Sequence, residues 1–165
     1  MIAIVDTNVP IVANRRSEQA SIECVLACAQ QLQQITQRGK LALDDQWRIL
    51  KEYMKHLSSS GQPGVGDAFL KWALNNIANP ARVETVPITP CNPDDPDGTD
   101  FREFPDDPAL AKFDPADRKF VAVAIAHPQH PRIMNATDRD WWNFKDTLHA
   151  HGVEVEFLCD EAKHS

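Results

Sequence analysis

The sequence predicts an α/β fold, a three-layer α/β/α sandwich in which a mostly parallel central sheet lies between two layers of helices. Two observations lead to this prediction. Short apolar runs alternate with amphipathic helical segments along the chain, an order typical of parallel strands connected by helices. The first apolar run, at residues 2–5, is continuous, as expected of a strand buried on both faces. With 165 residues, the chain is expected to form a single domain spanning 1–165.

The first half of the chain is expected to fold in the order β-α-α-β-α-α-β. Its helical segments place apolar residues at spacings of three and four, and Gly39 provides a stop signal after the longest of them. That helix is expected to bury Ile22, Val25, Leu26, Ala29, Leu32 and Ile35. The expected strands are 2–5, 40–43 and 83–88, and the expected helices are 9–14, 21–37, 46–57 and 67–76.

Residues 89–108 interrupt this pattern with five prolines, several acids and little apolar periodicity. A loop of this length in a compact domain is usually functional or disordered, and we expect a surface insertion tethered by Phe101 and Phe104. After it, Asp114 and Pro115 suit the N-cap and first turn of an almost wholly apolar helix. The remaining expected elements are a strand at 132–136, a helix at 142–151 and a strand at 153–158.

The composition excludes several classes of protein. The net charge is -7, with 24 acidic against 17 basic residues, whereas a non-specific nucleic-acid binder is usually basic. A nuclease is not excluded, because a carboxylate metal site itself adds negative charge. All six glycines are isolated and no GxSxG motif is present, which argues against dinucleotide, P-loop and serine-hydrolase sites. No apolar run approaches 18 residues, so we expect no membrane span.

The chain has four cysteines: Cys24, Cys28, Cys91 and Cys159. They show neither a CxxC motif nor paired zinc spacing. Cys24 and Cys28 lie four residues apart, on one face of the expected helix. We expect buried free thiols in a reducing compartment, and therefore a cytoplasmic protein.

Four acidic residues occupy positions from which their side chains could converge. Asp6 and Asp138 each follow a strand, Glu52 lies inside a helix, and Asp117 lies in the first turn of another helix. Carboxylates gathered in one crevice repel each other unless a hard divalent cation lies among them. Mg²⁺ or Mn²⁺ in such a site can activate water and hold a phosphodiester. Taken singly, Asp6 could instead be a helix N-cap and Glu52 a surface ion-pair partner.

The order of these motifs resembles that of the PIN-domain ribonucleases. The similar segments are 4–8 (Ile-Val-Asp-Thr-Asn), 49–53 (Ile-Leu-Lys-Glu-Tyr), 114–120 (Asp-Pro-Ala-Asp-Arg-Lys-Phe) and 136–141 (Ala-Thr-Asp-Arg-Asp-Trp). The last is similar to that family's closing acidic turn, with Trp141 in place of the commoner Phe. The resemblance covers most of the chain and departs at the 89–108 insertion.

The resemblance implies a nuclease that hydrolyses phosphodiester bonds in single-stranded RNA, or in DNA, with Mg²⁺ or Mn²⁺ as cofactor. The implied catalytic and metal-binding residues are Asp6, Glu52, Asp117 and Asp138, with Asp140 as a fifth metal ligand. The candidate substrate contacts are Asn8, Arg118, Lys119 and Arg139, with Arg15 and Arg16 as further phosphate contacts. Asn8 or Thr7 is expected to orient Asp6. Trp141 and Trp142 are candidates for base stacking, with core packing as the alternative.

Other functions remain open at this stage. The same fold could serve as the toxin of a toxin–antitoxin pair, whose protein partner would cover the acidic crevice, and a homodimer is a further option. A non-catalytic scaffold is expected to have lost one or more of the four acids, and all four are present. An aspartyl phosphatase would need an acid two residues after Asp6, where the chain has Asn8.

Overall fold

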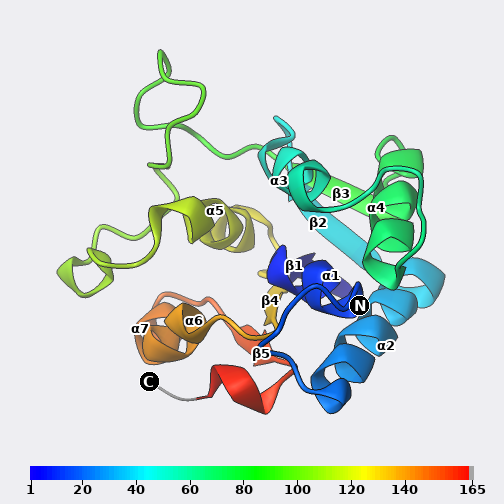
Figure 1. The fold of residues 1–165 in the computed structure, drawn as a ribbon. Coiled ribbons are helices and arrows are strands. Elements are labelled where there is room, and N and C mark those ends of the chain that lie inside the picture. Colours follow the sequence, from blue (N-terminus) through cyan, green and yellow to red (C-terminus); the bar gives the residue numbers. More distant parts are fainter. Residues whose placement is uncertain (164–165) are drawn as a thin grey trace.

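The computed structural model describes residues 1–163 and is built around a five-stranded sheet in the order β3-β2-β1-β4-β5 (Figure 1). Every pair of neighbouring strands is parallel, which confirms the predicted α/β class. The strands are β1 (Ile2–Val5), β2 (Lys40–Asp44), β3 (Val83–Val86), β4 (Arg132–Asn135) and β5 (Val155–Phe157).

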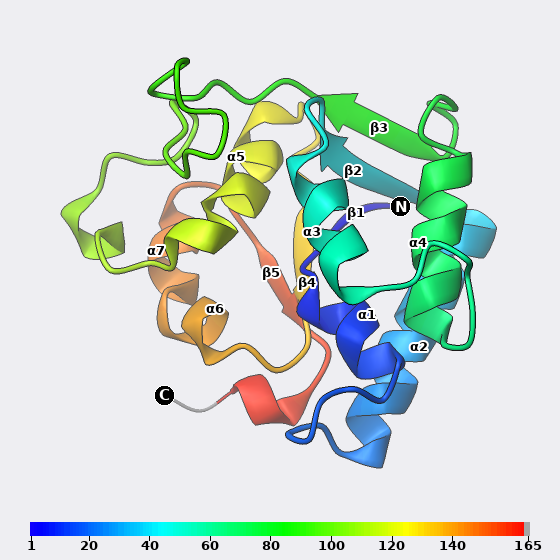
Figure 2. The same cartoon turned by 45° about the horizontal axis from the view of Figure 1, so that its top comes forward.

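Helices cover both faces of the sheet, as a three-layer arrangement requires (Figures 1 and 2). One layer holds α1, α2 and α4, which contact one another, and the opposite layer holds α5, α6 and α7. The helices are α1 (Asn8–Ala13), α2 (Ile22–Arg38), α3 (Arg48–His56), α4 (Val65–Asn75), α5 (Arg118–Ala126), α6 (Arg139–Asn143) and α7 (Lys145–Ala150). Short 3₁₀ turns occur at Pro108–Leu110, Pro115–Asp117 and Asp160–Ala162.

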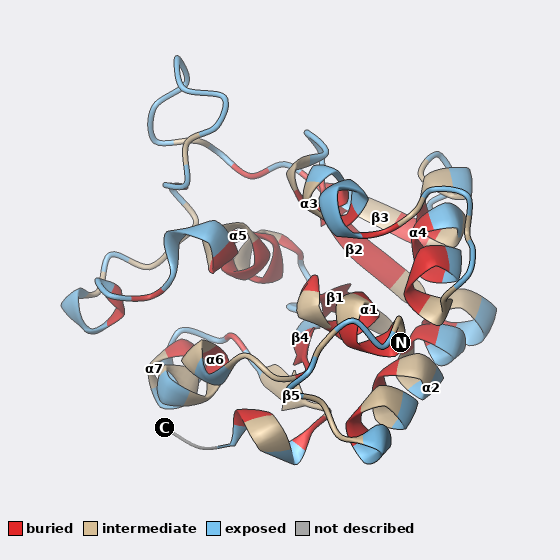
Figure 3. Cartoon of the chain, viewed as in Figure 1, coloured by how far each residue is buried: buried red, intermediate tan, exposed pale blue. Residues whose placement is uncertain are grey.

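The core lies on both faces of the central strands (Figure 3). β1 contributes Ala3, Ile4 and Val5, all buried, so its continuous apolar run is explained by helices on either side. The small apolar side chains of α5 allow that helix to pack against β1, β2 and β4. The α5 helix therefore covers one face of these three neighbouring strands, whose carboxyl ends lie at the same edge of the parallel sheet.

Two expected helices differ from the observed ones. The single helix expected at 142–151 is two helices, α6 and α7, which are separated at Phe144. In α2, Ile22 and Leu26 are 76% and 54% exposed, although both were expected in the core. The buried face instead runs through Cys24, Cys28, Leu32 and Ile35, whose spacing of four, four and three fits a helix equally well.

The insertion at 89–108 crosses the surface beside α5 and carries only one isolated bridge, between Pro90 and Phe101 (Figure 1). Phe101 is 3% exposed, and Phe104 packs against Phe113 with ring centroids 5.8 Å apart. Both aromatic residues therefore tether the insertion to the body of the protein, as predicted. Hydrophobic anchoring holds this otherwise polar segment in one place.

The prediction of buried free thiols is wrong for Cys24, which is buried but disulfide-bonded, and is confirmed for Cys28. Cys24 and Cys159 form a disulfide, Cys28 is free and buried, and Cys91 is free but exposed. The spacing along the chain could not reveal this pair, because the two residues are 135 positions apart and meet only in the folded protein. Burial, and to a lesser extent the charge of Glu161, raises the pKa of the Cys28 thiol to about 12.

Within residues 1–163, no helix is both long and apolar enough to cross a bilayer.

The strand order reverses direction at the centre of the sheet. From β1 the chain moves outward to β2 and β3, and it then returns to place β4 and β5 on the other side of β1. In open parallel sheets, ligands bind at such a reversal, outside the carboxyl ends of the two strands. The residues that follow β1 and β4 are therefore the first place to look for a site.

Candidate metal centre

Asp6 follows directly after β1 and is only 4% exposed. Its Oδ1 accepts a hydrogen bond from the Asn8 backbone N–H at 3.0 Å, and its Oδ2 accepts one from Trp141 Nε1 at 2.6 Å. Burial raises the pKa of Asp6 to about 7, although the two hydrogen bonds oppose this, and the charges of Asp138 and Glu52 raise it further. The carboxylate is thus held in a fixed orientation but is costly to ionise without a cation.

Asp117 reaches the same edge from the start of α5. Asp114 accepts a hydrogen bond from the Ala116 backbone N–H at 3.0 Å, and Pro115 begins the 3₁₀ turn that precedes the helix. This local structure leaves Asp117 8% exposed. Burial raises the pKa of Asp117 to about 9, with Asp6 and Asp138 as the next causes, while Lys119 acts in the opposite direction.

Asp138 completes the group from the turn after β4. Its Oδ1 accepts a hydrogen bond from the Asp140 backbone N–H at 2.9 Å, and its carbonyl accepts one from Asn135 Nδ2 at 2.8 Å. One carboxylate oxygen from each of Asp6, Asp117 and Asp138 lies within 4.8 Å of the others. We name these three residues the aspartate trio.

The aspartate trio fits a hard divalent cation. Carboxylate oxygens are the ligands that Mg²⁺ and Mn²⁺ prefer. Among residues 1–163, no Lys, Arg or His lies within ion-pair distance of these three carboxylates. Burial first, and then the charges of the neighbouring carboxylates, raises the pKa values of Asp6 and Asp117, so both groups favour keeping their protons when no cation is bound. A bound cation would take the place of those protons.

Glu52 lies next to the aspartate trio but is paired differently. Asp44 caps the start of α3 by accepting a hydrogen bond from the Ile49 N–H at 3.0 Å, and the helix then carries Glu52 to the site edge. Glu52 Oε2 accepts a hydrogen bond from Thr7, and its Oε1 pairs with Lys119 Nζ at 2.9 Å. Glu52 is therefore close enough to influence Asp6, yet it is neutralised by a lysine.

Asp140, predicted as a fifth metal ligand, is not part of the aspartate trio. Its Oδ2 accepts a hydrogen bond from the Asp114 backbone N–H at 3.0 Å, which ties α6 to the turn before α5. Burial raises its pKa, and the charges of Asp138 and Asp114 act in the same direction, whereas the hydrogen bond from Asp114 opposes them. Asp140 thus positions two of the turns that carry the site.

Asn8 has its side chain committed to the scaffold. Its Nδ2 donates to Asn135 Oδ1 at 2.8 Å, and its Oδ1 accepts from the Ala136 N–H at 2.7 Å. These bonds join the carboxyl ends of β1 and β4, while the Asn8 backbone holds Asp6 as expected. Asn135 was not among the predicted site residues, although it is a polar residue at the end of an apolar strand and is fully buried.

The candidate phosphate contacts are dispersed. Arg118 pairs with Asp100 of the insertion, and its guanidinium lies 4.9 Å from the centre of the Phe104 ring. Lys119 lies at Glu52, and Arg139 is exposed beside Asp138. Arg15 and Arg16 are exposed in the loop after α1. Of these residues, Lys119 lies close enough for its charge to lower the pKa of Asp117, and Arg139 lines one pocket together with Asp138.

A cleft of about 440 Å³ opens between α3 and the insertion, directly beside Glu52. Four basic side chains line it: Arg48, Lys51, Lys55 and Lys119. The insertion supplies the opposite wall with Pro96, Asp97, Gly98, Thr99 and Phe101. In a protein of net charge -7, four basic side chains gathered in one cleft favour an anion there, although Glu52 and Asp97 also line it.

Comparisons with protein-family models, curated proteins and solved structures give no match to this chain. The similarity of its motifs to PIN-domain ribonucleases therefore stays a prediction. The chemistry has to be judged from the aspartate trio, the ion pair beside it and the basic cleft. Together these features can hold a divalent cation next to a surface that favours anions.

Trp141 is fully buried, and its indole N–H is the side-chain donor to Asp6. Replacing it with Phe removes this donor while keeping an aromatic ring in the core. Because the bond favours the charged carboxylate, we expect the Asp6 pKa to rise and Mn²⁺ affinity at pH 7 to fall by about 10–100-fold, as for other groups that orient metal ligands. Calorimetric titration with Mn²⁺ measures the change.

Trp142→Phe is the matched control for this substitution. Trp142 packs against Phe157 and Lys145 rather than against the aspartate trio. We expect its Mn²⁺ affinity to equal that of wild type. Equal affinities for Trp141→Phe and wild type would show that the indole N–H does not support the metal site.

Proposed function

We propose that this chain is a divalent-cation-dependent nuclease that hydrolyses phosphodiester bonds in single-stranded nucleic acid, with RNA as the first candidate substrate. The observation that carries the proposal is the convergence of Asp6, Asp117 and Asp138 at the reversal point of a parallel sheet. The similarity of its motifs to PIN-domain ribonucleases supports the same reaction. The basic cleft beside the site supports a polyanionic substrate.

The aspartate trio would hold Mg²⁺ or Mn²⁺. When bound, such an ion supplies Lewis acidity and lowers the pKa of a water molecule. The chain itself fixes the Asp6 carboxylate through the N–H groups of Asn8 and Trp141. This fixed geometry keeps the ligand oxygens together before any cation arrives, which limits reorganisation during the reaction.

Lys119 connects the aspartate trio to the basic cleft. Its Nζ bonds to Glu52 at 2.9 Å, and it lines the cleft together with Lys51 and Lys55. A lysine ammonium is a mobile point charge with three donors, so it can hold a carboxylate and a phosphate at the same time. In this proposal, Glu52 and Lys119 would orient the substrate at the mouth of the site.

The experiment that tests the proposed function is cleavage of end-labelled single-stranded RNA, single-stranded DNA and double-stranded RNA. Each substrate is incubated with the purified protein in Mn²⁺, in Mg²⁺ or in excess chelator. We expect cleavage of single strands only when a divalent cation is present. Activity that persists in chelator would contradict the metal-dependent reaction, and inactivity on every substrate despite bound metal would favour a non-catalytic protein.

Lys51 and Lys55 are both exposed and lie one turn apart on α3. If the cleft binds the substrate backbone, replacing both lysines with Ala should raise the apparent KM while kcat changes little. The dependence of log KM on log salt concentration should also become shallower, by the amount expected for the loss of about one to two phosphate contacts. Steady-state cleavage at several salt concentrations measures both quantities. The double variant Arg38→Ala/Lys112→Ala removes two exposed charges that do not line the cleft and should match wild type. An unchanged KM in the α3 variant would place the substrate path elsewhere.

A further inference from the structure

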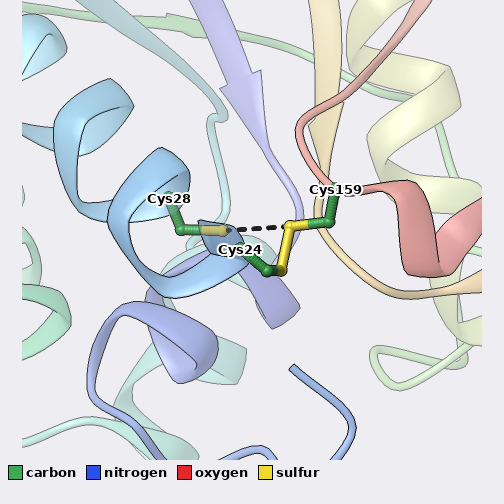
Figure 4. A group of neighbouring side chains, drawn as sticks. All are labelled: Cys24, Cys28 and Cys159. Carbon is green, nitrogen blue, oxygen red and sulfur yellow. Dashed lines mark hydrogen bonds between the residues drawn. A yellow bond between two sulfur atoms is a disulfide. The ribbon is translucent and has the colours of Figure 1, made fainter. Parts of the chain in front are cut away.

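Three buried cysteines meet on elements other than those that carry the aspartate trio. Cys24 and Cys28 lie one turn apart on α2, and Cys159 follows β5. Their Sγ atoms all lie within 4.8 Å of one another, and Figure 4 shows all three side chains directed at a common point between the helix and the C-terminal segment. Two of the three sulfur atoms form the Cys24–Cys159 disulfide, while Cys28 Sγ stands 3.9 Å from Cys159 Sγ.

The third cysteine is not explained by the disulfide. A pair of cysteines suffices to link α2 to the C-terminal segment, and a buried apolar residue would fill the position of Cys28. In a tetrahedral zinc site, Zn–S bonds of ~2.3 Å place two sulfur ligands ~3.8 Å apart. The separation of 3.9 Å between the Cys28 and Cys159 sulfur atoms is close to that value.

A carboxylate lies near the cysteines: the charge of Glu161 acts on the Cys28 thiol, although no Glu161 oxygen lies within 4.8 Å of all three sulfur atoms. Glu161 belongs to the 3₁₀ turn after Cys159, and its Oε1 accepts a hydrogen bond from Ser21 Oγ at 3.3 Å, next to the start of α2. Its Oε2 is buried and has no hydrogen-bond partner among residues 1–163. A buried carboxylate oxygen without a donor is costly, and a cation would satisfy it.

We propose that, once the disulfide is reduced, Cys24, Cys28 and Cys159 together bind one Zn²⁺ ion as thiolates, with Glu161 as the oxygen ligand. Three sulfur ligands and one oxygen give the four-coordinate shell typical of zinc. Soft thiolates select Zn²⁺ over Mg²⁺ and Mn²⁺, so this site is chemically distinct from the aspartate trio. The ion would join α2 to the C-terminal segment in a reducing compartment, where a disulfide does not persist.

The change from disulfide to zinc site balances as two steps. A phosphine reductant attacks one sulfur atom, and with one water molecule it yields two thiols and the phosphine oxide. Zn²⁺ then displaces three protons as the three thiols become thiolates. The first step consumes the two electrons of the phosphine, and the second involves no electron transfer.

The test uses Co²⁺ as a spectroscopic probe of zinc sites, added without oxygen to the full chain in phosphine. Thiolate ligands produce an intense sulfur-to-cobalt charge-transfer band, whereas the carboxylates of the aspartate trio do not. We expect this band in reduced wild type at one equivalent, its absence before reduction, and its loss when Zn²⁺ is added. Absence of the band from reduced wild type would overturn the proposal.

Cys28→Ser is the decisive variant, because it removes a ligand while leaving both partners of the disulfide. We expect at least tenfold weaker Co²⁺ binding at the cysteines, whereas Cys91→Ser, at the exposed cysteine, and Asp6→Asn should both keep the wild-type sulfur-to-cobalt band. Thiol counting without reductant checks that the Cys28→Ser variant is folded. If the variant still forms the Cys24–Cys159 disulfide, the chain is folded around this site. Wild-type cobalt affinity and band intensity in that variant would overturn the three-cysteine site, and unchanged affinity in Glu161→Gln would remove Glu161 from it.

Discussion

Replacing Asp6 with Asn is expected to lower the rate of metal-dependent RNA cleavage by at least about 100-fold. The substitution keeps the shape of the side chain and leaves an amide oxygen for the indole N–H of Trp141. It removes one of the three carboxylates that would hold the cation, and loss of a direct ligand should exceed the 10–100-fold cost of losing a group that merely orients one. Initial cleavage rates in saturating Mn²⁺ measure the effect.

The control for Asp6→Asn is Glu23→Gln. Glu23 is exposed in the first turn of α2 and its carboxylate is not part of the aspartate trio. It should cleave RNA at the wild-type rate. Equal initial cleavage rates in wild type and Asp6→Asn would show that the cleavage comes from another site or from a contaminating nuclease.

The second large effect is the pH dependence of stability in the metal-free protein. Asp6 and Asp117 have pKa values of about 7 and about 9 in the folded chain, raised from the ordinary 3.8 chiefly by burial. Between pH 5 and 7 the folded state keeps protons that the unfolded chain has released, so raising the pH favours unfolding. Each group contributes up to about 1.4 kcal/mol per pH unit, equivalent to about 3–6 °C in Tm for a chain of this size.

The stability conferred by these two protons is complete below pH 4 and is lost as the pH rises through about 7 and then about 9. Asp67 acts in the opposite sense: its pKa is lowered despite partial burial, because Ser58, Gly64 and Asn14 donate hydrogen bonds to it, so its contribution is lost in acid. Thermal unfolding in chelator from pH 5 to 9 should show a falling Tm. The slope should be smaller in Asp6→Asn, and a flat wild-type profile would mean that the two carboxyls do not share one buried site.

The aspartate trio could be predicted because parallel sheets impose a simple rule. Asp6 and Asp138 each follow an apolar strand, and β1 and β4 are neighbours, so their carboxyl ends must meet. Asp117 could be added because Asp114 and Pro115 mark the start of an apolar helix that has to pack on the sheet. Local chemistry and one topological rule therefore determine which three acids converge.

Side-chain pairing across the fold could not be predicted in the same way. Nothing near Arg118 in the sequence indicates that it pairs with Asp100, because the insertion has no periodicity from which to place that residue. Glu52 has two partners that are distant in sequence: Thr7 is 45 residues away and Lys119 is 67 residues away. On α2, Ile22 and Leu26 fit an apolar periodicity along the helix, but the buried face is the one that carries Cys24 and Cys28, so these two apolar residues are exposed.

The central claim is that Asp6, Asp117 and Asp138 share one cation. The most direct test compares Tm in Mn²⁺ with Tm in chelator, for wild type and for Asp6→Asn. A ligand that binds only the folded state at a hundredfold excess over Kd stabilises it by about 2.7 kcal/mol, or about 5–11 °C here. We expect this shift in wild type and in Glu23→Gln, and its near disappearance in Asp6→Asn, whose metal-free form should melt no lower than wild type. A full Mn²⁺ shift that survives in Asp6→Asn would contradict the shared site.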